Sequence, residues 1–440
     1  MSRPNIIVFL SDQQRHDTCG CYGQTLPVTP ELDRMAAEGV KFEHCFSAQP
    51  VCGPMRAAFQ TGLYPTATGC HVNHRALPLD ADTIAKRMRA AGYRCGYIGK
   101  WHLASEGERG GLTDFREKPV PPERRGGYDD FWLASDVLEF TSHGYDGHMF
   151  DGEGNKREFP DGRYRADAQT DWVLDYLDQQ NSEQPFFLFL SYIEPHHQND
   201  HHCYEGPHGS KERWKDFDTP GDLEGTEGDW RESYPDYLGC CNSLDENLGR
   251  IRRHLSQRGL ADNTIIIYTS DHGCHFRTRN KEYKRSCHEA SLHVPLVACG
   301  PGFTGGIVSE ELVSLIDLPP TILDCAAVEA PPMHGRSFKA LASGNASDWP
   351  TSVFAQVSES QCGRCIRTAR WKYGVDGVDV KGHDAHAERY VGQYLYDLEA
   401  DPHERDNRID DPALADVREK LRAELRAHMQ RVGEPPAVIA

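Results

Sequence analysis

The sequence predicts an α/β protein with a mostly parallel central sheet sandwiched by helices, and a smaller C-terminal α+β subdomain that contains an antiparallel sheet. Three observations lead to this fold class. Short apolar segments recur over residues 1–344, amphipathic segments separate them, and the pattern changes after a small polar stretch at 337–350. Apolar residues make up 38% of the chain, which is enough for large cores.

Five apolar segments have the composition of fully buried strands. They are rich in β-branched and aromatic residues and are nearly continuous, rather than alternating with polar residues. This pattern is typical of parallel strands that are covered on both faces. The predicted strands are 6–10, 95–99, 185–193, 264–270 and 294–300.

Helical segments lie between these strands, at 29–40, 80–93, 166–180 and 236–259. The alternation of strand and helix favours a mostly parallel sheet. Two further segments, 104–165 and 194–235, are rich in Gly, charge or His, and we expect long loops there.

The polar stretch at 337–350 predicts a division into an α/β domain over 1–344 and a subdomain over 345–440. Beyond it lie three strand-like pieces, SVFAQV, RCIRTARWKYGV and YLYDL, and then a segment with helical periodicity, ADVREKLRAELRAHMQRV. We therefore expect a small antiparallel sheet followed by a terminal helix.

Composition excludes some classes of function. The net charge of −19, with no basic stripe, argues against nucleic-acid binding. No run approaches 18 apolar residues, so no membrane span is expected. The fifteen scattered cysteines are expected to be reduced thiols. Residues 4–12 resemble a strand more than a signal peptide, which predicts a cytoplasmic protein as given, or a periplasmic or secreted one if a leader has been removed.

Polar residues follow four predicted strands at the point where each ends. They are Asp12-Gln13, Lys100-Trp101-His102, Glu194-Pro195-His196-His197 and Asp271-His272. Each alone is common in a turn or on a surface, but the carboxyl ends of strands in an open α/β sheet form one crevice. Oxygen ligands with one imidazole suit calcium, manganese or magnesium, and the absence of a clustered Cys/His set argues against zinc.

The segment VCGPMRAAFQTG (51–62) places a cysteine immediately before a predicted helix. Pro54 suits a first helical turn, and the positive end of the helix dipole favours negative charge at Cys52. Arg56 lies four residues on and can reach toward the same point. The alternative is a buried structural thiol, the usual state of a cysteine.

C-G-P-M-R matches the C-x-P-x-R signature of type I sulfatases, and the chain resembles this family of the alkaline-phosphatase-like superfamily over nearly its whole length. The resemblance extends to PNIIVFLSDQQRHDTCGCYG, GYIGKWHL, YTSDHG, KRSCHEASLHVPLV and RTARWKY…LYDLEADPHERDN. It implies an alkaline-phosphatase/sulfatase-like fold, with the 1–344 domain catalytic.

The resemblance also implies a mechanism. A formylglycine-generating enzyme would convert Cys52 to Cα-formylglycine, whose gem-diol would attack sulfur and form a covalent sulfo-enzyme intermediate. One divalent metal ion would be held by Asp12, Gln13, Asp271, His272 and residue 52. Family members often carry Asp in place of Gln13 and Asn in place of His272, so the ion stays open, with Ca²⁺ preferred over Mn²⁺ or Mg²⁺.

The remaining site residues also take their roles from the resemblance. Arg56 would stabilise the formylglycine, and Lys100 and Lys284 would hold sulfate oxygens. His102 would orient or deprotonate the gem-diol, and His196 would contact the sulfate and protonate the leaving oxygen, with or without Lys284.

Two alternative functions stay open at this point. One is a phosphonate monoester or phosphodiester hydrolase of the same superfamily, against which the intact G-K-W-H segment at 99–102 argues. The other is a non-catalytic carbohydrate-binding protein on the same scaffold, which would require an unmodified Cys52.

The sequence leaves the substrate and its surroundings less defined. A sulfated sugar is the expected substrate, with Asn73 and Arg75 as candidate binding residues. The cluster of His196, His197, His201, His202 and His208 is read as a loop that closes over substrate rather than as a separate transition-metal site. The sequence predicts no oligomeric state.

Overall fold

The structure is a computed structural model that describes residues 3–107, 109–181 and 183–440. Its larger sheet is 12-stranded, in the order β10-β2-β11-β9-β1-β8-β3-β4-β6-β5, with β12 beside β2 and β7 beside β6. The strands are β1 (Asn5–Ser11), β2 (Val40–Phe46), β3 (Arg94–Lys100), β4 (Phe131–Ser135), β5 (Ser142–His143), β6 (Asp146–Asp151), β7 (Lys156–Glu158), β8 (Phe186–Ser191), β9 (Thr264–Ser270), β10 (His293–Val294), β11 (Leu296–Cys299) and β12 (Ile307–Ser314).

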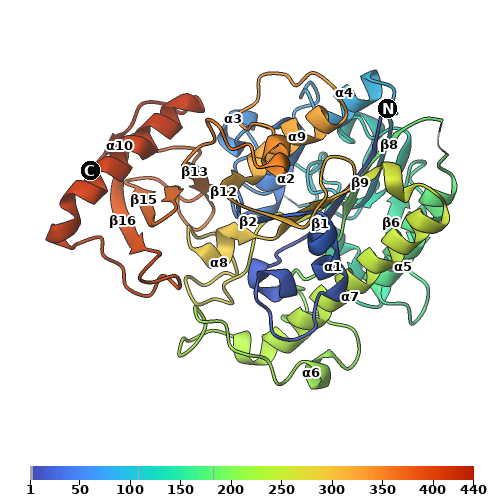
Figure 1. The fold of residues 1–440 in the computed structure, drawn as a ribbon, viewed down its shortest axis with the longest axis horizontal. Helices are drawn as coiled ribbons and strands as arrows, with labels where there is room; N and C mark the ends of the chain where they lie inside the picture. Colours follow the sequence, from blue (N-terminus) through green and yellow to red (C-terminus); the bar gives the residue numbers. More distant parts are fainter. Residues whose placement is uncertain (1–2, 108, 182) are drawn as a thin grey trace.

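The centre of this sheet, β9-β1-β8-β3-β4, is parallel throughout, as predicted. Alternate residues of β1 enter two separate cores because successive side chains of a strand point to opposite faces. Ile6 and Val8 pack with α2 (Cys52–Thr61), α4 (Ile84–Ala90) and α9 (Leu318–Cys325). Ile7 and Phe9 pack with α1 (Pro30–Glu38), α5 (Arg165–Asp178) and α7 (Trp230–Gln257). Figure 1 shows these two helical layers on either side of the sheet.

Three parts of the larger sheet differ from the prediction. Segment 294–300 is not a parallel strand: β11 runs antiparallel to both β2 and β9. Strands β2 and β12 were not predicted, because their alternating or charged residues lack the continuous apolar pattern. Segment 104–165, predicted as a loop, contains β4 to β7, and these strands extend one edge of the sheet.

The second sheet is 5-stranded and smaller, and Figure 1 shows it with α10 (Ala415–Arg431) at the C-terminal end of the molecule. Its strands are β13 (Ser352–Val357), β14 (Gly363–Thr368), β15 (Trp371–Gly377), β16 (Arg389–Asp397) and β17 (Val438–Ile439). The antiparallel order β13-β14-β15-β16 confirms the predicted subdomain sheet, whereas β17 is a parallel edge strand. RCIRTARWKYGV forms the two strands of a hairpin rather than one strand. The division at residues 344 and 345 stays a prediction.

The remaining helices are short: α3 (Pro65–Thr68), α6 (Ser210–Arg213) and α8 (Glu289–Leu292). Among the described residues, no helix combines the length and apolarity that a bilayer crossing needs. All fifteen cysteines are free thiols, as predicted.

Asp245 on α7 fixes the start of α1. Its carboxylate accepts hydrogen bonds from the backbone N–H groups of Glu31 (3.0 Å) and Leu32 (2.8 Å), which have no partner within their own helix. Burial outweighs these bonds and raises the pKa of Asp245 to about 7.

This raised pKa predicts a pH-dependent stability. Between about pH 4 and about pH 7 the native state holds the Asp245 proton more tightly than the unfolded state, so the free energy of unfolding falls as pH rises. Relative to Asp245→Asn, which cannot titrate, the wild type should lose on the order of 3 kcal/mol across this window. Urea denaturation at both ends of the window measures the difference. Glu246→Gln, an exposed neighbour on α7, is the control, and a difference that stays constant with pH would contradict the assignment.

Candidate active site

The sheet register brings two carboxylates together. Ser11, the last residue of β1, pairs with Ser270, the last residue of β9, so Asp12 and Asp271 leave the sheet side by side. Cys52 and His272 join them: one ligand atom from each of the four residues lies within 4.8 Å of the other three. All four side chains are buried. The structure therefore brings together four of the five predicted metal-binding residues.

Cys52 is the first residue of α2, where the helix dipole favours an anion. A Cβ at Gly53 would lie 2.9 Å from Asn73 Oδ1, which accepts the Gly53 N–H at 3.0 Å, so a larger residue there would displace Asn73. The Cys52 Sγ lies 2.8 Å from Lys284 Nζ and 3.2 Å from His272 Nε2. Burial would raise the pKa of this thiol, but Lys100, Lys284 and His272 outweigh it and lower the pKa well below its usual value.

The ligand atoms at this point fit a divalent cation. Asp271 Oδ1 accepts the backbone N–H groups of Gln13 (3.1 Å) and His272 (2.9 Å), whereas the buried Asp271 Oδ2 has no hydrogen-bond partner among the described residues. His272 Nδ1 lies 3.0 Å from the Gly273 carbonyl, which can only accept, so Nε2 keeps its lone pair and faces the two carboxylates.

Gln13, the fifth predicted ligand, lines the same cavity with φ of 70°. Its Nε2 donates a hydrogen bond to the Tyr204 hydroxyl oxygen at 3.3 Å, and this bond fixes the orientation of the side-chain amide.

Basic side chains surround Asp12. Its Oδ2 lies 2.8 Å from Lys100 Nζ and 3.1 Å from Arg56 Nη2. Burial and the Cys52 charge oppose ionisation of Asp12, but Lys100, His196 and Arg56 prevail and lower its pKa. Burial and the charge of Asp12 raise the pKa of Asp271. The two carboxylates are therefore unequal, and a cation between them would stabilise the ionised form of both.

Lys100 and Arg56 are themselves fixed by buried partners. Lys100 Nζ lies 3.2 Å from Glu139 Oε1, and its positive charge outweighs the effect of burial and lowers the pKa of Glu139 to about 2. Arg56 Nη1 donates to the Lys100 carbonyl and to Ser191 Oγ, each at 2.7 Å. Both cations are thus held at the carboxyl ends of β3 and β8.

A cavity of about 150 Å³ opens above Cys52. Lys284 Nζ and His196 Nε2 lie 3.1 Å apart at its wall. The two ring nitrogens of His102 are buried without a partner among the described residues. The lining residues are Gln13, Cys52, Asn73, His74, His102, Val137, Glu139, Phe140, His196, Asn199, Glu282, Tyr283, Lys284 and Arg285.

The predicted residue Arg75 does not lie with this group. Its side chain is 54% exposed and 3.9 Å from Glu106, and it is absent from the cavity lining. Asn73, by contrast, lines the cavity and binds the first turn of α2.

Two residues that position the site were missed because they lie in the segment predicted as a loop. Glu139 follows β4 and reaches Lys100. Asp136 accepts the backbone N–H groups of residues 103, 104 and 105, each at 2.9 Å, and so fixes the turn that carries His102. The signal was present: FWLAS (131–135) is an apolar strand followed by an acid, the same pattern used for the other four strand ends.

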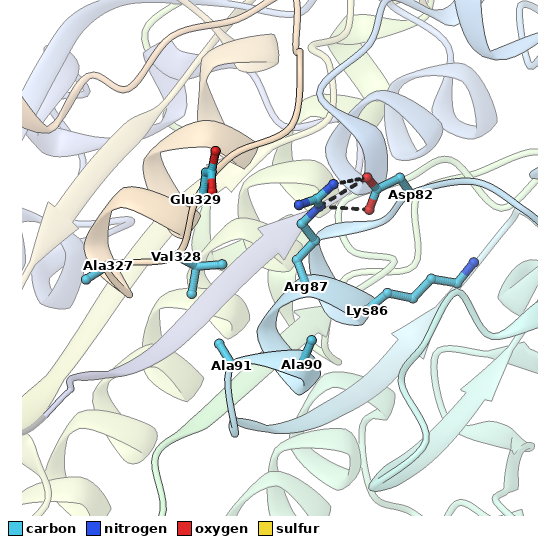
Figure 2. A pocket seen from close by; sticks show the side chains of 8 residues that line it. All are labelled: Asp82, Lys86, Arg87, Ala90, Ala91, Ala327, Val328 and Glu329. Atoms are coloured by element: carbon cyan, nitrogen blue, oxygen red, sulfur yellow. Dashed lines mark hydrogen bonds and ion pairs between the residues drawn. The ribbon is translucent and has the colours of Figure 1, made fainter.

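A wider depression of about 480 Å³ lies between α4 and the segment after α9 (Figure 2). It is lined by two alanines of the α4 end, an Arg87–Asp82 ion pair and residues 327–329. It shares no lining residue with the cavity at Cys52, and its lining brings together no comparable set of reactive groups.

Comparisons with known proteins identify what this chain is similar to. Residues 4–328 match the family model described as Sulfatase, and residues 281–431 match N-sulphoglucosamine sulphohydrolase, C-terminal. An ulvan-active sulfatase of Formosa agariphila is 28% identical over 98% of this chain and 82% of its own. An N-acetylglucosamine-6-O-sulfatase of Bacteroides thetaiotaomicron is 26% identical over 92% of this chain and 82% of its own. A solved structure of a protein with its substrate D-glucosamine-2-N,6-O-disulfate superposes with a TM-score of 0.78 at 23% identity, covering 98% of each chain.

If Asp12 and Asp271 hold a cation, Asp271→Asn should weaken Ca²⁺ binding by about two orders of magnitude, because one ligand charge is lost. Isothermal titration calorimetry measures the affinity, with the exposed Asp262→Asn, just before β9, as the control. In the cation-free protein Asp271→Asn should not lower the melting temperature, because it removes repulsion between two buried carboxylates. Unchanged Ca²⁺ affinity in Asp271→Asn would contradict the metal assignment.

Proposed function

Because the chain belongs to the sulfatase family of the alkaline-phosphatase-like superfamily and is a sulfuric ester hydrolase, we propose that its substrate is the sulfate ester of a carbohydrate. The observation that carries the site assignment is the position of Cys52. It lies at the start of α2 and contacts Asp12, His272 and Lys284 at the base of one cavity. Two comparison proteins whose names or structures include glucosamine derivatives support the sugar.

The proposed nucleophile is residue 52 after its conversion to Cα-formylglycine by a formylglycine-generating enzyme. The Cys52 Sγ then stands in for the oxygen that the mature residue carries on Cβ. Its surroundings support this assignment, since Lys284 and the α2 dipole both favour negative charge at that point.

The proposed cofactor is one divalent ion held by Asp12, Gln13, Asp271, His272 and residue 52. The ligand set is rich in oxygen, which supports Ca²⁺, with Mn²⁺ or Mg²⁺ as alternatives. When bound, such an ion polarises the attacking oxygen and offsets negative charge that develops in the transition state.

The basic residues would bind and orient the sulfate. Lys284 Nζ contacts the Cys52 Sγ at 2.8 Å, and the charge of Lys100 also acts on this thiol. Buried partners hold both lysines, so they need little reorganisation to meet an anion. Arg56 would stabilise residue 52 indirectly through Asp12.

Two histidines are placed for proton transfer. The ring nitrogens of His102 lie at the cavity without a partner among the described residues, and His102 would orient or deprotonate the nucleophile. His196 Nδ1 lies 2.7 Å from the His197 carbonyl, so in the neutral ring Nε2 accepts from Lys284. The proton for the leaving oxygen would therefore come from Lys284 or from a doubly protonated His196.

The polar cavity lining supports a hydroxylated leaving group. Asn73, Asn199 and Glu282 provide hydrogen-bond donors and acceptors around the cavity, as a sugar requires. Arg75 lies outside the lining, so a contact with substrate would need a substrate longer than the cavity.

Conversion of Cys52 predicts a mass change and a dependence of activity on maturation. Co-expression with a formylglycine-generating enzyme should lower the mass of the peptide that contains residue 52, and aryl-sulfate hydrolysis should rise with the converted fraction. Cys52→Ala should abolish turnover under both conditions. Equal activity from protein that retains the thiol would contradict the proposed nucleophile, and would leave the family assignment intact.

A rate comparison tests the choice of sulfate over phosphate. The matured protein should hydrolyse sulfated mono- and oligosaccharides and an aryl sulfate with higher kcat/KM than a phosphodiester or a phosphonate monoester. Faster turnover of the phosphorus substrates would overturn the proposal. A thiol retained at Cys52 after co-expression, together with binding of sulfated sugars and no turnover, would instead support a non-catalytic carbohydrate-binding protein.

A further inference from the structure

A second cluster of ligand-type side chains lies outside the catalytic cavity. His143 of β5 faces Asp200 and His201, which lie in the loop after β8, and one ligand atom from each residue lies within 4.8 Å of the other two. We propose that these three residues bind a divalent transition-metal ion of the Zn²⁺ class, separate from the catalytic cation.

The two imidazoles lie face to face, so one ring must turn out of the stack for both to bind one ion, because the lone pair of an imidazole nitrogen lies in the plane of its ring. The rings of His143 and His201 are stacked, with centroids 4.0 Å apart and planes 7° from parallel. His143 Nε2 lies 2.9 Å from Asp200 Oδ2, so an imidazole nitrogen and a carboxylate oxygen are close enough to bind the same ion. Two imidazole nitrogens with one carboxylate oxygen and an open position suit Zn²⁺ better than Ca²⁺.

Each imidazole also has a carboxylate on its other nitrogen. His143 Nδ1 lies 3.0 Å from Asp146 Oδ1, and His201 Nδ1 contacts Glu205 Oε1. Metal-binding histidines commonly show this arrangement, because the outer carboxylate fixes the tautomer and makes the inner nitrogen a stronger ligand. Ordinary surface ion pairs do not require two matched carboxylate–imidazole pairs that face each other.

The protein positions the cluster without help from a metal. Glu205 Oε2 accepts the Gly144 N–H at 2.7 Å, and the Glu205 carbonyl accepts the Tyr164 hydroxyl at 2.7 Å. The ring of His208 stacks on Tyr145 at 4.0 Å. These contacts fasten the 200–208 loop to the β5–β6 hairpin. The side chains of His201 and Asp200 are about half exposed, so they can rotate to close the distances to those of a tetrahedral site.

A metal here would also fix one wall of the catalytic cavity. Gln198 Nε2 donates to Asp200 Oδ1 at 2.7 Å and to the Glu139 carbonyl at 2.9 Å. Asn199, between these residues, lines the cavity. Binding at the cluster would therefore restrict the loop that carries His196.

Zinc titration of the Ca²⁺-loaded enzyme, in excess Ca²⁺ to protect the catalytic site, tests the proposal. Calorimetry should detect a Zn²⁺ site that His143→Asn and His201→Asn each weaken by about tenfold or more. Glu205→Gln, which preserves the shape of the side chain, should weaken it by about tenfold. His202→Asn, the neighbouring exposed histidine, is the matched control and should bind Zn²⁺ as the wild type does.

Hydrogen exchange gives a readout independent of activity and of affinity. Zn²⁺ should slow exchange of backbone amides in residues 198–205 of the wild type and of His202→Asn, but not of His143→Asn. Equal Zn²⁺ affinity in wild type, His143→Asn and His201→Asn would overturn the proposal, as would an equal loss in His202→Asn. Melting temperatures without Zn²⁺ identify any variant that fails to fold. If a histidine variant does so, the Zn²⁺ affinity of Glu205→Gln decides: an affinity equal to that of the wild type would overturn the proposal.

Discussion

The repulsion between two buried carboxylates is the constraint on which the site depends. Asp12 and Asp271 extend from neighbouring parallel strands whose register allows no other placement. Neither is exposed to water, so positive charge must lie close to both. Arg56 and Lys100 supply part of it on one side of Asp12, and the ligand atoms on the other side leave room for a cation.

This constraint also explains the position of residue 52. The start of α2 is a region of positive potential, and Lys284 adds to it from the opposite wall. A sulfate ester that enters the cavity meets Lys284 and His196 at its wall, whereas the buried Asp12, Asp271 and Lys100 do not line it. The bottom of the site can therefore carry two carboxylates while its wall binds an anionic substrate, although the net charge of the chain is −19.

The central strands and the site residues at their ends could be predicted because one physical pattern specifies both. Nearly continuous apolar strands are typical of covered parallel strands, whose carboxyl ends meet at one edge of the sheet, and only β11 among the five predicted strands departs from this pattern by running antiparallel. Strand β2 escaped prediction because polar and charged residues interrupt its apolar pattern, whereas β4 is apolar but short and lies in a segment rich in Gly, Pro and charge. Glu139 follows β4 and was therefore not predicted as a site residue. Arg75 was predicted as a binding residue because it lies close to Asn73 in the chain, but its side chain lies outside the cavity.

The histidine-rich loop gives a second example of a contact that the sequence could not predict. The sequence grouped its histidines with one another, but His201 faces His143, from a hairpin 58 positions earlier in the chain. No local spacing specifies such a pair. The structure also links this loop to Lys100 through Gln198 and Glu139.

The most direct test of the account is the crystal structure of the matured, cation-loaded protein, with the metal located by anomalous scattering. The account predicts one cation bound by oxygen atoms of Asp12 and Asp271, with the modified side chain of residue 52 completing its coordination. A cation bound elsewhere, or a side chain at residue 52 that points away from both aspartates, would contradict it.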